Sequence, residues 1–360
     1  MQRFSLLAVG LWLGLVVASQ VFAASVDGLY EVRIPVATQA EAEREGAVKQ
    51  AMATVLVRVT GNRQIETVPA GAKIVGLAGR FLRQYRYESM PVGKTVEGVS
   101  PLPTQLLYAQ FDEAALNEAI WREKLTVWGK TRPSLLVWLV TQDVDRHVAF
   151  EDRADSMLGQ ALREQARNRG VPLLIPTFDA ADQAKVSIED VWNGVVERIR
   201  QASVRYPTEA ILAGQVAQMP DGSWAGRWVY MLGEELKTWD LHAPDANALA
   251  KAALDAASDE IAARYAPSVV SGEAAEVVIR VADVRNVDDY ARTQRYLASL
   301  PGASSVQVVK VEATRLLLRV DLRSGKAAFE QAIALGGQLG PDRLDPNLDP
   351  AASLVYRLLP

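Results

Sequence analysis

The chain has 360 residues, a formal net charge of −4 at pH 7 and no cysteine. Without cysteine it can form no disulfide, thiol nucleophile or zinc–thiolate site. The slight excess of acidic residues speaks against nucleic acid as a partner and against a basic membrane-docking surface. The length exceeds the roughly 100–200 residues of a typical single domain, so we expect several domains.

The first 23 residues have the pattern of a signal peptide. Arg3 supplies a positive charge, an uncharged apolar stretch covers 4–18, and Val21 and Ala23 precede a cleavage site. The alternative is an uncleaved membrane anchor, but the stretch is shorter than the ~20 residues that a membrane span needs. We therefore expect cleavage near Ala23 and a soluble protein that is periplasmic or secreted.

Residues 24–125 are predicted to form an N-terminal α/β domain. Alternating residues over 29–36 predict a strand, and apolar residues at helical spacing predict a helix over 38–62. Thr38 and Glu41 have the spacing of a capping box at the start of that helix. The remaining expected elements are a helix over 73–82, two paired strands flanking a loop over 91–103, and a helix over 112–125 capped by Asp112.

Residues 126–266 are predicted to form a central domain. Continuous apolar runs over 134–143 and 171–178 predict strands buried on both faces. A tight turn at 220–222 predicts a hairpin between two further strands. Helices are expected over 153–170, 188–206 and 245–266. The resulting element order favours a three-layer α/β sandwich with a mixed sheet.

Residues 267–273 are predicted to be a linker, followed by a C-terminal domain over 274–360. The order strand, helix, strand, strand, helix predicts a small ferredoxin-like fold, with a closing strand over 354–359. The fold class is therefore α/β, with three small α/β domains. A basic rim is expected on the last of them, from Arg315, Arg319, Arg323 and Lys326.

Several segments together carry a family resemblance: LYEVRIPV (29–36), LVRVTGN (56–62), RPSLLVWLV (132–140) and RGVPLLIPTFD (169–179). They resemble the domain of unknown function 2066 family of bacterial envelope proteins. The resemblance implies a secreted or periplasmic protein of Gram-negative bacteria and implies no known activity. The central region resembles the α/β domain shared by the TolB amino-terminal domain, curli-secretion lipoproteins and penicillin-binding-protein activators. That likeness implies an envelope interaction domain.

The run ILAGQV ends an expected strand with Gly214, and a strand that enters a glycine can precede a phosphate loop. Such a loop needs several glycines and a following helix N-terminus, whereas one glycine followed by Gln-Val-Ala-Gln continues the strand. We therefore interpret Gly214 as a glycine that permits close packing or a bulge.

A group of carboxylates follows the first strand of the central domain and includes Asp143 and Asp145. Ligands of open α/β sheets bind where such strands end, so these two residues are candidate binding residues for Ca²⁺ or a cationic ligand. The alternative is a solvated charged loop. Two features favour it: the segment lacks the glycine of a Ca²⁺-binding loop, and it contains Arg146.

The second candidate group is aromatic. Trp224, Trp228 and Tyr230 lie on one face of the expected hairpin, because their spacing is even. They form either a buried sheet face under helices or an exposed patch that binds a glycan or a protein.

Catalytic patterns are missing from the sequence. The two histidines, His147 and His242, have polar surroundings, and no G-x-S-x-G pattern or metal-ligand spacing occurs. We expect no cofactor, and an exported, non-catalytic binding or scaffold protein whose partner is another envelope protein. The alternatives are a carboxylate-dependent hydrolase or glycan-modifying enzyme near 143–155, and a protein that binds a glycan or small molecule.

Overall fold

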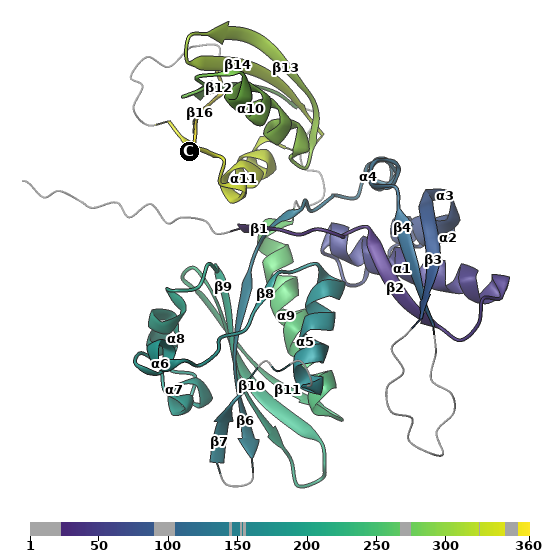
Figure 1. The fold of residues 1–360 in the computed structure, drawn as a ribbon, viewed down its shortest axis with the longest axis vertical. Helices are drawn as coiled ribbons and strands as arrows, with labels where there is room; N and C mark the ends of the chain where they lie inside the picture. Colours follow the sequence, from purple (N-terminus) through teal and green to yellow (C-terminus); the bar gives the residue numbers. More distant parts are fainter. Residues whose placement is uncertain are drawn as a thin grey trace, which may run out of the picture.

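The protein is a mixed α/β structure, as predicted, with its sheets distributed over three units (Figure 1). We call them the N-terminal unit (residues 31–122), the central unit (135–265) and the C-terminal unit (275–358). A two-stranded sheet of β1 (Ala23–Ser25) and β5 (Thr131–Pro133) lies between them. The computed structural model describes residues 23–89, 105–143, 146–151, 153, 156–266, 275–323, 325–342 and 352–360.

The predicted signal peptide and linker fall mainly or wholly outside these described residues, and the domain boundaries stay predictions. Within the described part of the chain, no helix combines the length and the apolar character that crossing a membrane requires.

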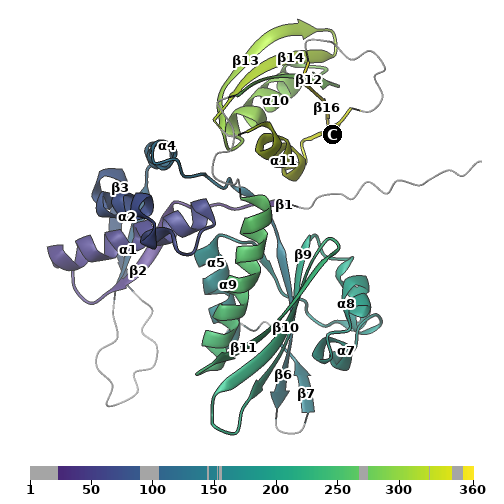
Figure 2. The same cartoon turned by 180° about the vertical axis from the view of Figure 1, so that it is seen from behind.

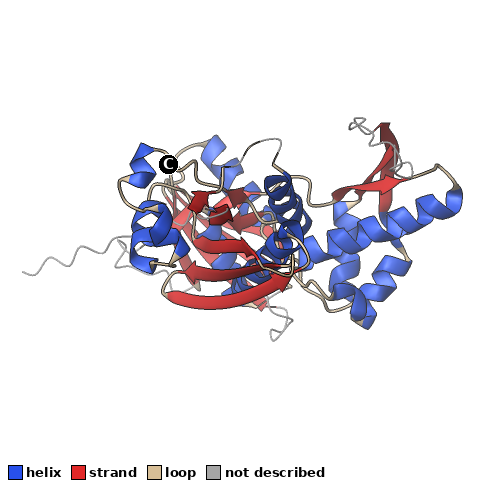
Figure 3. Cartoon of the chain, turned by 90° about the horizontal axis from the view of Figure 1, so that it is seen from below, coloured by secondary structure: helices blue, strands red, loops and turns tan. Residues whose placement is uncertain are grey.

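The N-terminal unit packs its helices against one face of a three-stranded antiparallel sheet of order β2-β4-β3, as Figure 3 shows. Its longest helix, α1, buries a stripe with three- and four-residue spacing that includes Ala51, Val55 and Val59. Its elements are β2 (Glu31–Val36), α1 (Glu41–Thr60), a 3-10 turn (Ile65–Thr67), α2 (Pro69–Gly76), α3 (Ala78–Phe81), β3 (Leu82–Ser89), β4 (Gln105–Phe111) and α4 (Glu113–Arg122).

Asp112 caps α4 as predicted, because its side chain accepts a hydrogen bond from the backbone N–H of Ala115. The capping box expected from Thr38 and Glu41 is wrong. Helix α1 begins after Ala40, and no side chain caps it. Instead, the Glu43 carboxylate folds back and accepts hydrogen bonds from the backbone of Thr38 and of the residue before it.

The central unit is a three-layer sandwich around a mixed sheet of order β11-β10-β9-β6-β7, with β8 added beside β6. Strands β6 and β9 are parallel, and β9, β10 and β11 form an antiparallel meander. Helices α5 and α9 cover one face and α6, α7 and α8 the other (Figures 1 and 2). The elements are β6 (Leu135–Asp143), β7 (Arg146–Ala149), α5 (Met157–Arg169), β8 (Leu173–Leu174), α6 (Ala180–Gln183), α7 (Ile188–Trp192), α8 (Val196–Ser203), β9 (Ala210–Gln218), β10 (Trp224–Leu232), β11 (Glu235–Ala243) and α9 (Ala246–Tyr265).

Two predicted elements of the central unit are shorter than expected. The strand predicted over 171–178 is reduced to two residues, because Pro172 and Pro176 on either side have no N–H to donate. The helix predicted over 188–206 is divided into α7 and α8. Gly194 stands between them with a φ of +65°, a left-handed conformation that ends a helix.

The C-terminal unit is ferredoxin-like, as predicted. Its sheet has the order β13-β14-β12-β16-β15, in which β12 and β13 are the two strands of the split βαβ pattern, with β14 antiparallel between them. The predicted closing strand, β16, lies beside β12 and runs parallel to it. Aromatic and aliphatic side chains of its two helices complete the core, among them Tyr296 and Phe329. Its elements are β12 (Ala275–Ala282), α10 (Val287–Ser299), β13 (Ala303–Glu312), β14 (Arg315–Leu322), α11 (Lys326–Gly336), β15 (Leu339–Pro341) and β16 (Leu354–Leu358).

Candidate functional site

The aromatic residues of the hairpin lie mostly in the core. Trp228 and Tyr230 are fully buried between the sheet and α9, and Trp224 is half-buried. Burial, and to a smaller extent the negative charge of Glu260, raises the pKa of Tyr230 well above its usual value. Two of the three side chains therefore have no surface to offer a glycan or protein, which favours the buried alternative.

Gly214 is the cross-strand partner of Trp228, and the indole ring lies directly over it. A Cβ atom on Gly214 would stand 2.3 Å from Cε3 and Cζ3 of that ring. The close-packing interpretation of this glycine is confirmed. The strand continues past Gly214 to Gln218, so no phosphate loop begins here.

Asp143 is exposed at the end of β6, where its Oδ2 lies 3.4 Å from Nη2 of Arg146. Asp145, the other acidic candidate, lies outside the described residues. Within the described part of the chain, no cluster of three or more histidine, aspartate or glutamate side chains has an arrangement that could hold a metal ion. The structure therefore gives Asp143 a local ion pair with a neighbouring arginine.

A groove of about 420 Å³ opens beside that end of the sheet, on the face that carries α7. Its floor includes Gln215, Arg227, Asp240 and His242, and Trp192 lines it from α7. The His147 ring stacks on Trp192 with centroids 3.7 Å apart. Both histidines of the chain therefore lie at or next to this groove, a proximity that their sequence positions did not suggest.

The junction between the N-terminal and central units is built around Arg132. The side chain is fully buried, and its guanidinium lies 4.1 Å from the centroid of the Trp128 ring. Burial lowers its pKa to about 9. Its N–H groups donate hydrogen bonds of 2.8–3.4 Å to the carbonyl oxygens of Arg58, Trp128, Gly129, Arg169 and Gly170.

These acceptors include the C-terminal ends of two helices. The Arg58 carbonyl belongs to the last turn of α1, and the carbonyls of Arg169 and Gly170 end α5. A cation is favourable at the negative end of a helix dipole, and Arg132 serves two such ends at once. One side chain thereby joins a helix of the N-terminal unit to a helix of the central unit.

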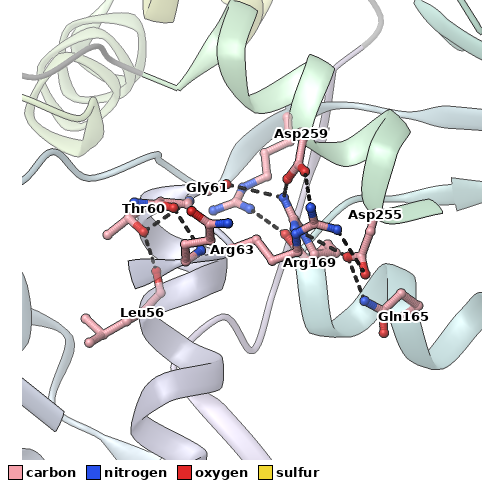
Figure 4. Close-up of polar contacts among 11 residues, drawn as sticks. Leu56, Thr60, Gly61, Arg63, Gln165, Arg169, Asp255 and Asp259 are labelled. Atoms are coloured by element: carbon pink, nitrogen blue, oxygen red, sulfur yellow. Dashed lines mark hydrogen bonds and ion pairs between the residues drawn. The ribbon is translucent and has the colours of Figure 1, made fainter. Parts of the chain in front are cut away.

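A second junction lies nearby and is ionic (Figure 4). Arg169, only 2% exposed, pairs with Asp255 and Asp259 of α9 and also donates to the carbonyl of Gly61 at the end of α1. Arg63 reaches the same two carboxylates from the N-terminal unit, at 3.8 and 3.4 Å. Two arginines from different units therefore share one pair of carboxylates.

This shared pair predicts the effect of Asp259→Asn. The amide keeps the size of the carboxylate but removes its charge from both arginines, so we expect the free energy of unfolding to fall by about 1–2 kcal/mol. Urea denaturation measures the change. The matched control is Asp240→Asn, which breaks an exposed pair with Arg227 and should cost less than about 0.5 kcal/mol. Equal losses in the two variants would contradict a role for the network in holding the units together.

The C-terminal unit also contacts the N-terminal unit. Arg323 donates a hydrogen bond of 2.6 Å to Oε2 of Glu118 on α4, and its guanidinium lies 4.4 Å from the centroid of the Trp121 ring. This arginine belongs to the basic rim expected from the sequence. The structure uses it for a contact within the chain.

The central and C-terminal units meet through backbone as well as side chains. Nε2 of Gln331 on α11 donates to the carbonyl of Arg264 at 2.7 Å. Gly129, in the segment that connects the N-terminal and central units, packs on Pro301 so closely that a Cβ on the glycine would lie 2.3 Å from Cγ of the proline. A cavity of about 300 Å³ remains between the two units beside this contact. All three pairs of units are therefore in direct contact.

Sequence reasoning missed the arginines of these junctions. Arg58 did give a signal, because it falls three residues after Val55 and seven after Ala51, within the apolar stripe of its helix. A charged residue at such a position is expected to have buried partners. Arg132 precedes a proline between two expected elements and gave no comparable signal.

Comparisons with known proteins give limited information about function. The family described as "Domain of unknown function (DUF8605)" matches residues 23–129, so the N-terminal part of the chain carries a domain of unknown function. No curated protein matches the chain in sequence. One similar solved structure is a competence-damaged protein (CinA) superfamily protein from Enterobacter cloacae, 15% identical over 37% of this chain and 82% of that one. Its TM-score of 0.24 is too low to support an inference.

Proposed function

We propose that the protein is a non-catalytic binding or scaffold protein, exported to the envelope of a Gram-negative bacterium, that presents three α/β units in one fixed arrangement to another envelope protein. The observation that carries the proposal is the contact between every pair of units. Arg132 and Arg169 join the N-terminal and central units, Arg323 joins the N-terminal and C-terminal units, and Gln331 joins the C-terminal and central units.

The sequence patterns support the same proposal. The signal-peptide pattern that ends at Ala23 is typical of an exported protein. The resemblance to the domain of unknown function 2066 family, and of the central unit to the TolB-type α/β domain, favours an interaction role in the envelope. The family matched at 23–129 adds no activity to this picture.

The surface that we assign to the partner is the edge of the C-terminal sheet. Strand β13 is the edge strand there, and it exposes Val309 and Val311 by 48% and 63%. An edge strand offers unpaired backbone groups to a strand of another chain, and exposed valines next to them add apolar area. The bulge between Val308 and Lys310 restricts such pairing to part of the strand.

The test is an in-cell crosslinking pull-down of the tagged full chain. We expect wild type to recover one envelope protein in stoichiometric amount, and the double variant Val309→Asp/Val311→Asp to lose most of it, because a charge on the edge strand disfavours strand addition. The control is Val204→Asp, which places the same charge at an 80% exposed valine of the central unit.

Two results would contradict parts of the proposal. If wild type recovers no protein but turns over an envelope substrate, the binding role is wrong. If the partner is retained by the β13 variant and lost with Val204→Asp, the binding role stands and the assigned surface is wrong. Intact mass measurement of the tagged chain itself shows whether its first 23 residues have been removed.

A further inference from the structure

A large cavity lies at the junction of the N-terminal and central units, between residues of β2 and residues of α5. Its volume is about 700 Å³, within the range of roughly 300–1,000 Å³ that is typical of small-molecule sites. Arginines line it from both units: Arg33 and Arg58 from the N-terminal unit, and Arg163 and Arg167 from α5.

Arg58 is the buried member of this group, with only 7% of its surface exposed. Its Nη1 donates to the carbonyl oxygens of Gly28 and Glu31, but its Nε has no hydrogen-bond partner within the described part of the chain. A buried guanidinium N–H without an acceptor is costly, because the group has lost its water and received nothing in exchange.

The charges around Arg58 increase this cost. Burial, and to a smaller extent the positive charge of Arg167, lowers the pKa of Arg58 to about 10. The neighbouring Arg132 has no carboxylate partner either, since backbone carbonyls take up its N–H groups. A negatively charged ligand would relieve the repulsion between Arg58 and Arg167.

The carboxylates in the lining are mostly occupied elsewhere. Glu31 accepts a hydrogen bond from Gln110, and Glu164 lies 3.6 Å from Lys251. Asp27 is the remaining acidic residue of the lining, and it is exposed. Among the arginines, Arg33 already pairs with Glu88 at 2.8 Å. Arg58 and Arg167 are two cations of the cavity that pair with no carboxylate among the described residues.

We propose that this cavity binds a metabolite-sized ligand through an oxyanion group, a phosphate or a carboxylate, with Arg58 and Arg167 as its two guanidinium donors. Planar guanidinium groups match the geometry of both oxyanions and form short, charge-assisted hydrogen bonds with them. The inference does not depend on the surface assigned to the partner protein, because that surface lies on the C-terminal unit.

The test measures thermal unfolding of the full chain as sodium phosphate or sodium succinate is added, each against sodium chloride at matched ionic strength. Phosphate stabilises proteins generally, so the informative quantity is the saturable part of the rise in Tm. We expect Arg167→Gln to weaken the apparent affinity about 10- to 100-fold, the loss expected for one charge-assisted hydrogen bond. Arg167 is exposed, so the variant should still fold.

The matched control is Arg198→Gln, which removes an exposed arginine from α8 on the opposite face of the central sheet. It should bind like wild type. Saturation with phosphate alone or with succinate alone identifies the oxyanion. Co-sedimentation with phosphatidylglycerol vesicles that Arg167→Gln abolishes would identify a lipid headgroup as its source. The proposal is overturned if wild type and Arg167→Gln show the same rise with both anions, whether or not a partner protein is recovered in the crosslinking experiment.

Discussion

Replacing Arg132 with methionine should lower the free energy of unfolding by about 4 kcal/mol, the largest loss that we expect from any substitution proposed for this chain. The change removes the donor of five carbonyl oxygens, four of them in buried hydrogen bonds, and each buried acceptor left unsatisfied costs about 1–3 kcal/mol. Removing the buried charge recovers part of that cost, because the guanidinium no longer has to be kept away from water.

Arg132→Lys tests whether the positive charge of residue 132 or the donor geometry of its guanidinium stabilises the junction. Lysine keeps the positive charge but has three donors around one nitrogen, so it cannot reach the ends of both α1 and α5. We expect it to restore about half of the lost stability. Full restoration would show that charge alone matters and would contradict the bridging role.

The measurement for both variants is denaturation followed by tryptophan fluorescence and by far-UV circular dichroism. In wild type the N-terminal and central units should unfold together, whereas in Arg132→Met the two probes should no longer coincide. The control is Lys130→Met, which removes a neighbouring cation that is 47% exposed and pairs with Glu113. It should change stability by less than about 0.5 kcal/mol.

Gly214→Ala should destabilise the central unit by about 3 kcal/mol. The added Cβ would overlap the Trp228 ring at 2.3 Å, where carbon atoms normally stay about 3.5–4.0 Å apart. The ring cannot withdraw, because it is fully buried between the sheet and α9. Overpacking of this kind usually costs about 1–3 kcal/mol, and here the rigid neighbours favour the upper end.

Two further variants check the cause of this loss. In the double variant Gly214→Ala/Trp228→Leu the alanine should cost at least 1 kcal/mol less than in the wild-type background, since the overlapping ring is gone. Gly46→Ala serves as the control, because nothing lies within 4 Å of its added Cβ inside α1. It should be neutral or stabilising by up to about 1 kcal/mol. Urea denaturation measures these variants and Trp228→Leu alone, which is the reference for the double variant. A Gly214→Ala variant as stable as Gly46→Ala would contradict the packing explanation.

Elements with strong local signals could be predicted from the sequence. The hairpin of β9 and β10, the alanine-rich helix α9 and the ferredoxin-like order of the last unit all follow from periodicity and turn residues. The break between α7 and α8 could also have been predicted from Gly194, which has a left-handed conformation with a φ of +65°. The two-residue strand β8, which is only half-buried, shows that an apolar run between prolines need not pair as a strand over its whole length.

The candidate site was harder to predict, for a physical reason. Arg58, Arg132 and Arg169 acquire their roles from backbone carbonyls and carboxylates far away in the chain, such as the contact between Arg169 and Gly61. The composition of the sequence and the spacing of its residues do not identify such distant partners. The sequence correctly placed the aromatic residues of the hairpin on one face of the sheet. Alternation alone does not show whether a helix covers that face, and in the structure α9 covers it.

The measurement that tests the central claim most directly is the distance between the N-terminal and C-terminal units in solution. Because the chain has no cysteine, spin labels can be placed at Glu45→Cys on α1 and Arg295→Cys on α10, both exposed helix positions. Double electron–electron resonance should give one narrow distance distribution in this background and a broad one when Arg132→Met is added. A broad distribution without the Arg132 change would contradict the claim that the contacts between the units hold all three in one fixed arrangement.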